Sequence, residues 1–154
     1  MIKKMLVELD GSESSDKTLR FALDLAEKYY AEILLLNVYQ PITPLFHFPP
    51  MSISTTPIET PITTAALSKE LKTRHENILA EALEKTQKIR PNLKVSTMLR
   101  EGRPSENIIE VANEEKIDLI VLGSRGIGSI KESLLGNVRD RVTDEAKCSI
   151  LIVK

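Results

Sequence analysis

Residues 118–137 read DLIVLGSRGIGSIKESLLGN, a short apolar run followed directly by a segment that holds four glycines. An apolar run of this length, bounded by charged residues and glycines, is typical of a buried strand. Glycines after a strand allow the backbone to turn sharply and to present its N–H groups to one point. The segment therefore predicts either a bound anionic group or a tight connection between the strand and the next helix.

Similar apolar runs alternate with helical patterns along the whole chain. Strands are predicted at 3–10, 32–38, 93–100, 118–123 and 149–154, and helices at 12–30, 67–89, within 101–117 and at 137–147. This alternation predicts a parallel sheet with right-handed crossovers and helices on both faces. The expected fold class is α/β, a single Rossmann-like doubly wound domain over residues 1–154. The polar positions of 93–100 favour a half-covered strand at a sheet edge.

Residues 40–66 interrupt the alternation. Six of the eight prolines lie here, which excludes a helix interior or a central strand and predicts a long loop. The loop is also too apolar for a solvated linker, because it contains Leu45, Phe46, Phe48, Met51 and Ile53. We expect it to pack over a partner subunit or beside the ligand site.

The composition excludes several classes of protein. The 154 residues include 21 basic and 22 acidic side chains, so the net charge is −1 and there is no basic excess that would point to nucleic acid. The single cysteine, Cys148, excludes an intramolecular disulfide and a Cys-rich metal site; its place beside an apolar strand favours a buried structural role. The N-terminal apolar run is too short for a signal peptide or a membrane span. These features predict a cytoplasmic protein that contacts no membrane.

Two common phosphate-binding motifs do not fit the glycine segment. A P-loop needs Lys-Ser/Thr where this chain has Ser129 and Ile130. The dinucleotide fingerprint needs a third glycine where Lys131 stands, and it should follow the first strand rather than the fourth. The spacing that remains is Gly123-x2-Gly126-x9-Gly136.

That spacing resembles the universal stress protein family, whose nucleotide-binding branch carries G-x2-G-x9-G. The resemblance extends from MLVELDGSESSDKTLRFALDLAEKYYAEILLLNV at 5–38 to LLGNVRDRVTDEAKCSILIVK at the end. It implies a Rossmann-like fold with strand order 3-2-1-4-5 and an ATP site between the first and fourth strands. The family relation also implies homodimerisation through strand 149–153, an apolar edge that would invite pairing with a second copy.

The resemblance also implies roles for individual residues. Asp10 would face the adenosine end, and the backbone of Val38 would meet the adenine. The first phosphate loop would contain Gly123, Arg125 and Gly126, and the second Gly136, Asn137, Val138 and Arg139.

The chain departs from the family pattern at three of its positions. Asn137 and Arg139 stand where hydroxyl residues are expected, and Glu8 replaces a proline that often precedes the aspartate. An Asn amide and an Arg guanidinium both donate hydrogen bonds to phosphate. A carboxylate at position 8 would repel phosphates if it pointed into the site.

Simpler interpretations remain open for these residues. Asp10 is equally explained as a cap of the first helix or as a brace of the turn at Gly11. Arg125 and Arg139 fit a phosphate site or a solvated surface, whereas Arg141 is expected to be a surface charge. The glycines themselves are also compatible with a tight strand-to-helix connection.

No constellation for catalysis or for a metal is visible. His47 and His75 lack a partner at ligand spacing, and His75 is expected to pack on the apolar stripe of its helix. The serines at 12, 14 and 15 offer helix caps and have no His nearby to activate them.

The sequence thus favours an ATP-dependent switch or sensor in the stress response rather than a dedicated enzyme. Mg²⁺ would be held mainly by the phosphates, and slow hydrolysis is compatible with the site. The alternative is a nucleotide-free dimeric module that binds other proteins. A related adenine-nucleotide hydrolase fits less well, because those enzymes usually carry further substrate-domain sequence.

Overall fold

The computed structural model describes residues 1–41, 64–124 and 138–154, which form strands and helices in strict alternation. This order confirms the alternation predicted from the apolar runs. The elements are β1 (Lys4–Glu8), α1 (Glu13–Tyr29), β2 (Glu32–Tyr39), α2 (Thr64–Ile89), β3 (Val95–Glu101), α3 (Pro104–Glu114), β4 (Leu119–Gly123), α4 (Val138–Glu145) and β5 (Ser149–Val153).

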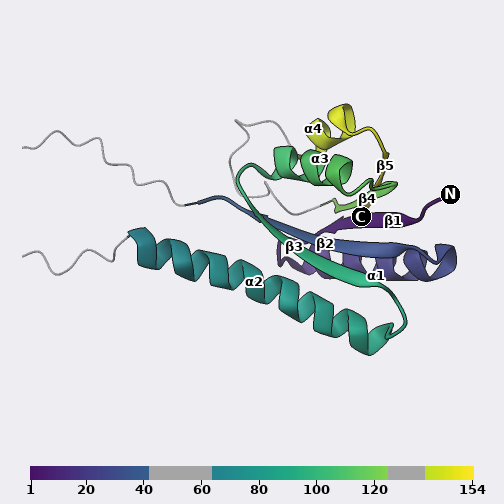
Figure 1. The fold of residues 1–154 in the computed structure, drawn as a ribbon, viewed down its shortest axis with the longest axis horizontal. Coiled ribbons are helices and arrows are strands. Elements are labelled where there is room, and N and C mark those ends of the chain that lie inside the picture. Colours follow the sequence, from purple (N-terminus) through teal and green to yellow (C-terminus); the bar gives the residue numbers. More distant parts are fainter. Residues whose placement is uncertain (42–63, 125–137) are drawn as a thin grey trace, which may run out of the picture.

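The strands form one parallel sheet in the order β3-β2-β1-β4-β5, which confirms the expected topology (Figure 1). β1 lies between β2 and β4, so that Leu6 is opposite Leu34 on one side and Ile120 on the other. From β1 the chain adds β2 and β3 toward one edge, and then crosses back to add β4 and β5 toward the other edge. The winding therefore reverses between β1 and β4, the position at which open α/β sheets bind ligands.

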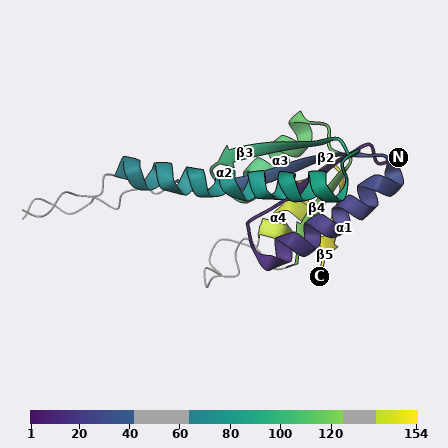
Figure 2. The same ribbon diagram turned by 90° about the horizontal axis from the view of Figure 1, so that it is seen from below.

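Helices cover both faces of the sheet, α1 and α2 on one face and α3 and α4 on the other (Figures 1 and 2). The core correspondingly divides into two clusters. Val7 of β1 packs in the first cluster with residues of α1 and α2, whereas Leu6 packs in the second with Ile108 of α3 and Val142 of α4. Because successive side chains of a strand point to opposite faces, a sheet covered on both sides needs near-continuous apolar strands.

The two edge strands are less buried than the three strands between them. β3 and β5 carry exposed and half-buried positions, whereas Leu6 and Val7 of β1 are fully buried. The edge position predicted for 93–100 is therefore confirmed. The half-covered pattern of β3 follows from its place at the edge, where it pairs with β2 alone.

Helix α1 begins and ends at residues with clear local causes. Ser12 is the N-cap, and its hydroxyl accepts a hydrogen bond of 3.2 Å from the backbone N–H of Ser15. Tyr30 ends the helix in the left-handed region at φ 54°, and its N–H donates back to carbonyl groups of the last turn. The cap at Ser12 is one of the three serine caps that the sequence offered.

Three details differ from the sequence predictions. β1 ends at Glu8 rather than at residue 10, because the chain turns through Gly11 at φ 80°. Residues 64–66, predicted as loop, form the first residues of α2, since the alanines that follow Pro61 are strong helix formers. Cys148 is half-buried rather than buried, because it precedes an edge strand. The other residues of the predicted loop, 42–63, lie outside the described part of the chain.

Candidate functional site

The candidate site lies at the carboxyl ends of β1, β2 and β4. Asp10 follows β1, Val38 lies near the end of β2, and Gly123 ends β4. Because these strands are adjacent and parallel, their carboxyl ends meet at the same edge of the sheet. The sequence-predicted residues Asp10, Val38 and Gly123 are therefore brought to one end of the molecule.

The turn after β1 is held by the side chain of Asp10. Asp10 Oδ1 accepts a hydrogen bond of 2.9 Å from the N–H of Ser12, the N-cap residue of α1. Gly11, between them, has a φ of 80°, and a Cβ at this residue would lie 2.7 Å from Ile78 Cδ1 of α2. The interpretation of Asp10 as a brace of the Gly11 turn is confirmed.

Val38 offers its backbone rather than its side chain. The side chain is 6% exposed and packs in the second core cluster. The carbonyl of Leu36 accepts a hydrogen bond of 2.9 Å from Leu9 N–H, after which β1 leaves the sheet. Residues two apart in a strand direct their peptide groups to the same side, so the N–H and C=O groups of Val38, like those of Leu36, point toward the β1 side of β2. No strand lies there at the level of Val38, because β1 ends at Glu8.

The end of β4 is tied to the start of α4. Gly123 pairs with Val153 of β5, and Ser124 N–H donates to the Val153 carbonyl at 2.7 Å. The Arg139 guanidinium, in the first turn of α4, donates from Nη1 to the Ser124 carbonyl at 3.2 Å. A helix N-terminus carries a partial positive charge, so the start of α4 places this charge and the Arg139 guanidinium beside β4, although Asp140 in the same turn lies 3.9 Å from Arg139 Nε.

Four of the predicted site residues, Arg125, Gly126, Gly136 and Asn137, lie outside the described residues. Arg141, which was expected to be a surface charge, forms ion pairs with Glu106 at 3.0 Å and with Glu145 at 2.9 Å. Its side chain is 42% exposed, which confirms that expectation.

Glu8 is a buried carboxyl group at the end of β1. The residue is 7% exposed, and among the described residues no hydrogen-bond partner reaches its Oε1. Burial raises the pKa of the Glu8 carboxyl well above its ordinary value, and the nearby charge of Asp10 raises this pKa further. From the sequence, Glu8 was noted only as a departure from a family pattern. The residues next to it in the sequence do not indicate that a charged residue at this strand end is buried.

A network of polar side chains that the sequence did not predict supports the turn after β1. It lies on the face of the sheet that α2 covers, opposite to the face of Glu8. Asn37 is fully buried, and its side-chain N–H donates to the Leu9 carbonyl, while its Oδ1 lies 2.7 Å from His75 Nδ1 of α2. The His75 ring stacks on Tyr39 with centroids 5.5 Å apart, and Tyr39 donates a hydrogen bond to Glu101. Burial lowers the pKa of His75, and the charge of Arg74 lowers it further.

These contacts and its half-buried position confirm that His75 is a packing residue of α2. The signal that would have found its partner is Asn37 itself, a polar residue inside the apolar run EILLLNV. A buried amide in such a run needs hydrogen-bond partners, and these come from the loop after β1 and from α2.

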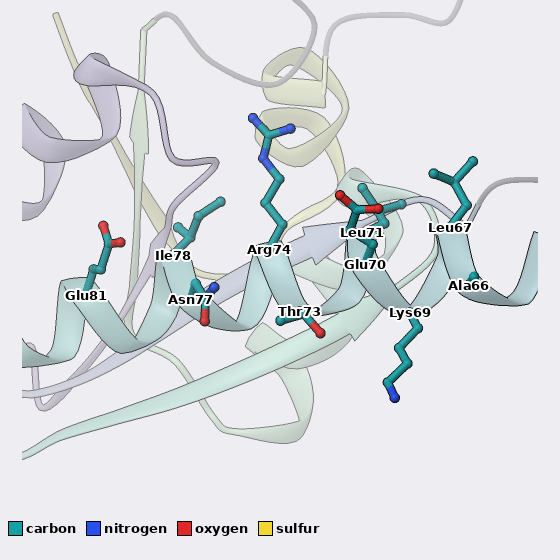
Figure 3. Close-up of a pocket in the computed structure, with 10 residues that line it drawn as sticks. All are labelled: Ala66, Leu67, Lys69, Glu70, Leu71, Thr73, Arg74, Asn77, Ile78 and Glu81. Atoms are coloured by element: carbon teal, nitrogen blue, oxygen red, sulfur yellow. The ribbon is translucent and has the colours of Figure 1, made fainter. Parts of the chain in front are cut away.

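Residues 66–81 of α2 border an open hollow of about 840 Å³ (Figure 3). Every residue that lines it belongs to α2, and Leu67, Leu71, Arg74 and Ile78 project to the same side of the helix in Figure 3. In both ribbon views this end of α2 extends past the sheet (Figures 1 and 2). The hollow is thus the side of a projecting helix rather than part of the site at the strand ends.

Within residues 1–41, 64–124 and 138–154, no group of His, Cys, Asp and Glu side chains is arranged to hold a metal ion. None of the helices in these segments combines the length and the apolar character that crossing a membrane requires.

A parallel sheet in the order 3-2-1-4-5 with helices on both faces defines a Rossmann-like α/β protein, in which the strand ends at the reversal are the candidate ligand site. Comparison with known proteins gives the family within this class. The profile of the universal stress protein family matches residues 1–154, and the chain belongs to this family.

Two curated relatives match over their full lengths. The chain is 32% identical to universal stress protein YxiE of Bacillus subtilis over 161 aligned positions, which cover 100% of both chains. It is 31% identical over 154 positions, again 100% of both chains, to a universal stress protein of Thermus aquaticus encoded in the 3' region of QAH/OAS sulfhydrylase.

Solved structures share the fold. UspA from Lactobacillus plantarum superposes with a TM-score of 0.74 at 22% identity, covering 99% of this chain and 98% of that one. A universal stress protein in complex with cAMP gives 0.70 at 24% identity, with coverage of 99% and 96%. Two others, from Archaeoglobus fulgidus with dAMP and from Arabidopsis thaliana with AMP, give 0.66 and 0.63 at 18% identity, with coverage of 100% and 100%, and of 99% and 91%. At these identities the likeness shows the fold alone.

Proposed function

We propose that this protein binds an adenine nucleotide, ATP, at the carboxyl ends of β1, β2 and β4, and that it acts as a nucleotide-dependent switch or sensor. The observation that carries the proposal is the meeting of three features at the point where the sheet reverses. These are the braced turn at Asp10, the peptide groups of Val38 and the N-terminus of α4 with the Arg139 guanidinium. Proteins of the same fold hold cAMP, dAMP and AMP, which supports an adenine nucleotide as the ligand.

The proposed contacts divide between the two ends of the nucleotide. Asp10 and the backbone of Val38 serve the adenosine end. The phosphates take the N–H groups and cations of two loops, in which Asn137 and Arg139 act as donors in place of hydroxyls. The first of these loops contains Gly123, Arg125 and Gly126, and the second Gly136, Asn137, Val138 and Arg139.

A switch fits these groups better than a fast enzyme does. Attack of water on a γ-phosphate needs a base within hydrogen-bond reach of the water. The half-buried Asp10 carboxylate, which follows β1, is already engaged with the N–H of Ser12. We therefore assign no catalytic residue, and Mg²⁺ in this proposal is held mainly by the phosphates.

Calorimetry with the full-length protein tests the proposal directly. ATP titrated with Mg²⁺ should release heat with one site per chain, and protein denatured straight after purification should release an adenine nucleotide. Gly126→Val should weaken binding, because a side chain there obstructs the close approach of backbone to phosphate. The absence of both bound nucleotide and heat would refute ATP binding.

Two arginines of α4 offer a matched pair for the phosphate end. Arg139→Ala should weaken ATP binding by about tenfold to a hundredfold, the usual effect of losing a charged hydrogen bond. Arg141→Ala removes the same charge from the same helix, but its guanidinium pairs with Glu106 and Glu145, so affinity should stay unchanged. Equal effects of the two substitutions would point to general charge rather than to a phosphate contact.

We propose in addition that the protein is a homodimer joined through β5. This strand is at the sheet edge and has half-buried apolar positions from Ile150 to Val153, so one side of its backbone is available to a second copy. Light scattering at micromolar concentration should give twice the chain mass, and Ile152→Lys should give the monomer mass. A monomeric wild-type protein would contradict the dimer and leave the nucleotide site untouched.

A further inference from the structure

Strand β2 continues past the end of β1. The Cα pairing of the two strands ends at Glu8 and Leu36, whereas β2 runs on to Tyr39. One backbone bond follows the last pair, from Leu9 N–H to the Leu36 carbonyl. In a parallel ladder the next bond would run from Val38 N–H to the Leu9 carbonyl. That bond is not formed, although both residues belong to the described part of the chain.

The Leu9 carbonyl is held by a side chain instead. Asn37 is fully buried, and its amide Nδ2 donates to this carbonyl. A carbonyl oxygen only accepts, so the bond fixes which end of the Asn37 amide faces Leu9. The other end, Oδ1, lies 2.7 Å from His75 Nδ1 of α2. Because Oδ1 also only accepts, His75 Nδ1 carries the hydrogen and donates it, and α2 orients the Asn37 amide.

This side-chain bond explains why the ladder stops before Val38. A buried carbonyl needs a hydrogen-bond partner, and Asn37 supplies the one that Leu9 would otherwise take from Val38 N–H. The Val38 carbonyl likewise receives no bond from Gly11 N–H, because Gly11, at φ 80°, turns the chain toward α1. Val38 thus keeps one donor and one acceptor on the side of β2 from which β1 has departed, where the winding of the sheet reverses.

A backbone N–H and C=O side by side match one purine better than the other. Adenine presents an acceptor at N1 beside an amino donor, whereas guanine presents a donor at N1 beside a carbonyl acceptor. A base held in one orientation by its sugar and phosphates makes both bonds to Val38 only if it is adenine. A polar site of this kind rejects the mismatched base, because its own groups are then left unpaired.

We propose that Asn37, oriented by His75, is a positioning residue for the base: it takes the Leu9 carbonyl and so leaves the N–H and C=O groups of Val38 for adenine. This inference rests on the nucleotide site proposed above. Neither Asn37 nor His75 touches the nucleotide, and both act through the backbone of Val38. Recognition of the base is therefore set from α2, whereas the phosphate end depends on α4.

Amide hydrogen exchange of the free full-length protein, measured by nuclear magnetic resonance, tests the backbone step without any nucleotide. Val38 N–H should exchange about tenfold or more faster than the N–H of Leu36, which lies within the β1–β2 ladder. Asn37→Leu keeps a side chain of similar size but cannot bond the Leu9 carbonyl. Val38 N–H should then bond this carbonyl and exchange more slowly than in wild type. A merely structural role of Asn37 predicts the opposite, faster exchange throughout β2.

Calorimetric titration with ATP and with GTP tests the consequence for the base. Wild-type protein should prefer ATP by about tenfold or more, and Asn37→Leu should lose most of this preference through weaker ATP binding. His75→Phe keeps a ring that stacks on Tyr39 but has no donor for Asn37, so it should show a smaller loss in the same direction. His75→Asn, whose Nδ2 takes the place of the ring Nδ1, should restore the preference.

Thr86→Val is the matched control for lost stability. Thr86 is a fully buried polar residue of α2, but its hydroxyl bonds the Ala82 carbonyl within the same helix. The substitution should lower the free energy of unfolding and leave the ATP-over-GTP preference unchanged. Circular dichroism checks that each variant is folded. If Asn37→Leu does not fold, the two variants of the half-buried His75 decide the matter.

Three results would overturn the role of Asn37 and leave the nucleotide site standing. These are faster exchange of Val38 N–H in Asn37→Leu, a wild-type protein that binds ATP and GTP equally, and the same ATP-over-GTP preference in wild type and His75→Phe. An equal loss of preference in Thr86→Val would do so as well, because it would indicate general loosening of α2. Failure of wild-type protein to bind ATP would overturn both proposals.

Discussion

The contact between Gly11 and Ile78 should make these two positions thermodynamically coupled. Gly11 has a φ of 80°, and a side chain in the left-handed region costs about 1–2 kcal/mol. A Cβ there would also lie 2.7 Å from Ile78 Cδ1 and 3.1 Å from Cγ1, so Ile78 must leave its rotamer, at about 0.5–1.5 kcal/mol. Gly11→Ala should therefore lower the free energy of unfolding by about 2–3 kcal/mol.

Ile78→Val removes the Cδ1 atom that creates the closest approach. On its own this substitution should cost about 0.5–1.5 kcal/mol, toward the lower end because Ile78 is only partly buried. In the double variant the closest approach is gone and most of the rotamer cost with it, while Cγ1 at 3.1 Å and the backbone cost remain. The double variant should thus be more stable than the sum of the single effects predicts, by about 1 kcal/mol.

Urea unfolding followed by far-ultraviolet circular dichroism measures all four proteins of this cycle. Gly102 provides the control, because its φ is 128° and its nearest neighbour would be Asn107 Nδ2 at 3.0 Å, not Ile78. Gly102→Ala combined with Ile78→Val should be additive within about 0.5 kcal/mol. Additive effects at Gly11 and Ile78 would refute the inference that a side chain at position 11 is obstructed by Ile78.

Three further predictions concern stability. Burial lowers the pKa of His75 in the folded protein. The free energy of unfolding that the neutral ring contributes is therefore complete above about pH 6.5 and is lost as the pH falls toward the folded-state pKa. His75→Gln should flatten this part of a plot of the free energy of unfolding against pH. Burial raises the pKa of Glu8, so the free energy of unfolding falls as the pH rises from the unfolded-state pKa to the folded-state pKa of this group. Glu8→Gln should therefore be more stable than wild type at high pH but not at low pH. Ile108→Ala should lower the free energy of unfolding in urea by about 2–5 kcal/mol, because Ile108 is fully buried between α3 and the sheet; a cost below about 1 kcal/mol would contradict its place in the core.

The parts of the candidate site that follow strands could be predicted, because strand ends are marked locally. Asp10 and Gly123 stand directly after apolar runs, and parallel pairing brings such positions to one edge. Beside its proposed contact with adenosine, Asp10 had two structural interpretations, a cap of α1 or a brace of the Gly11 turn. The structure distinguishes them by the hydrogen bond from Ser12 N–H.

Glu8 shows why burial was harder to predict than position. The residue was predicted to lie in the first strand, 3–10, but its exposure depends on Leu36 of β2 and on the second core cluster. Those residues come to it only when the sheet has formed. The same holds for His75, whose apolar stripe was visible but whose hydrogen bond to Asn37 was not.

The sequence by itself determined the fold class and the order of elements. Apolar runs of strand length that alternate with amphipathic helices can bury both faces of a sheet in few ways, and right-handed crossovers limit these further. Only the tertiary structure decided how the β1 turn is held, through Asn37 across 28 residues to Leu9 and across 38 residues to His75. Contacts so distant along the chain leave no periodic signal, because each depends on how separate elements pack rather than on the local pattern of any one of them.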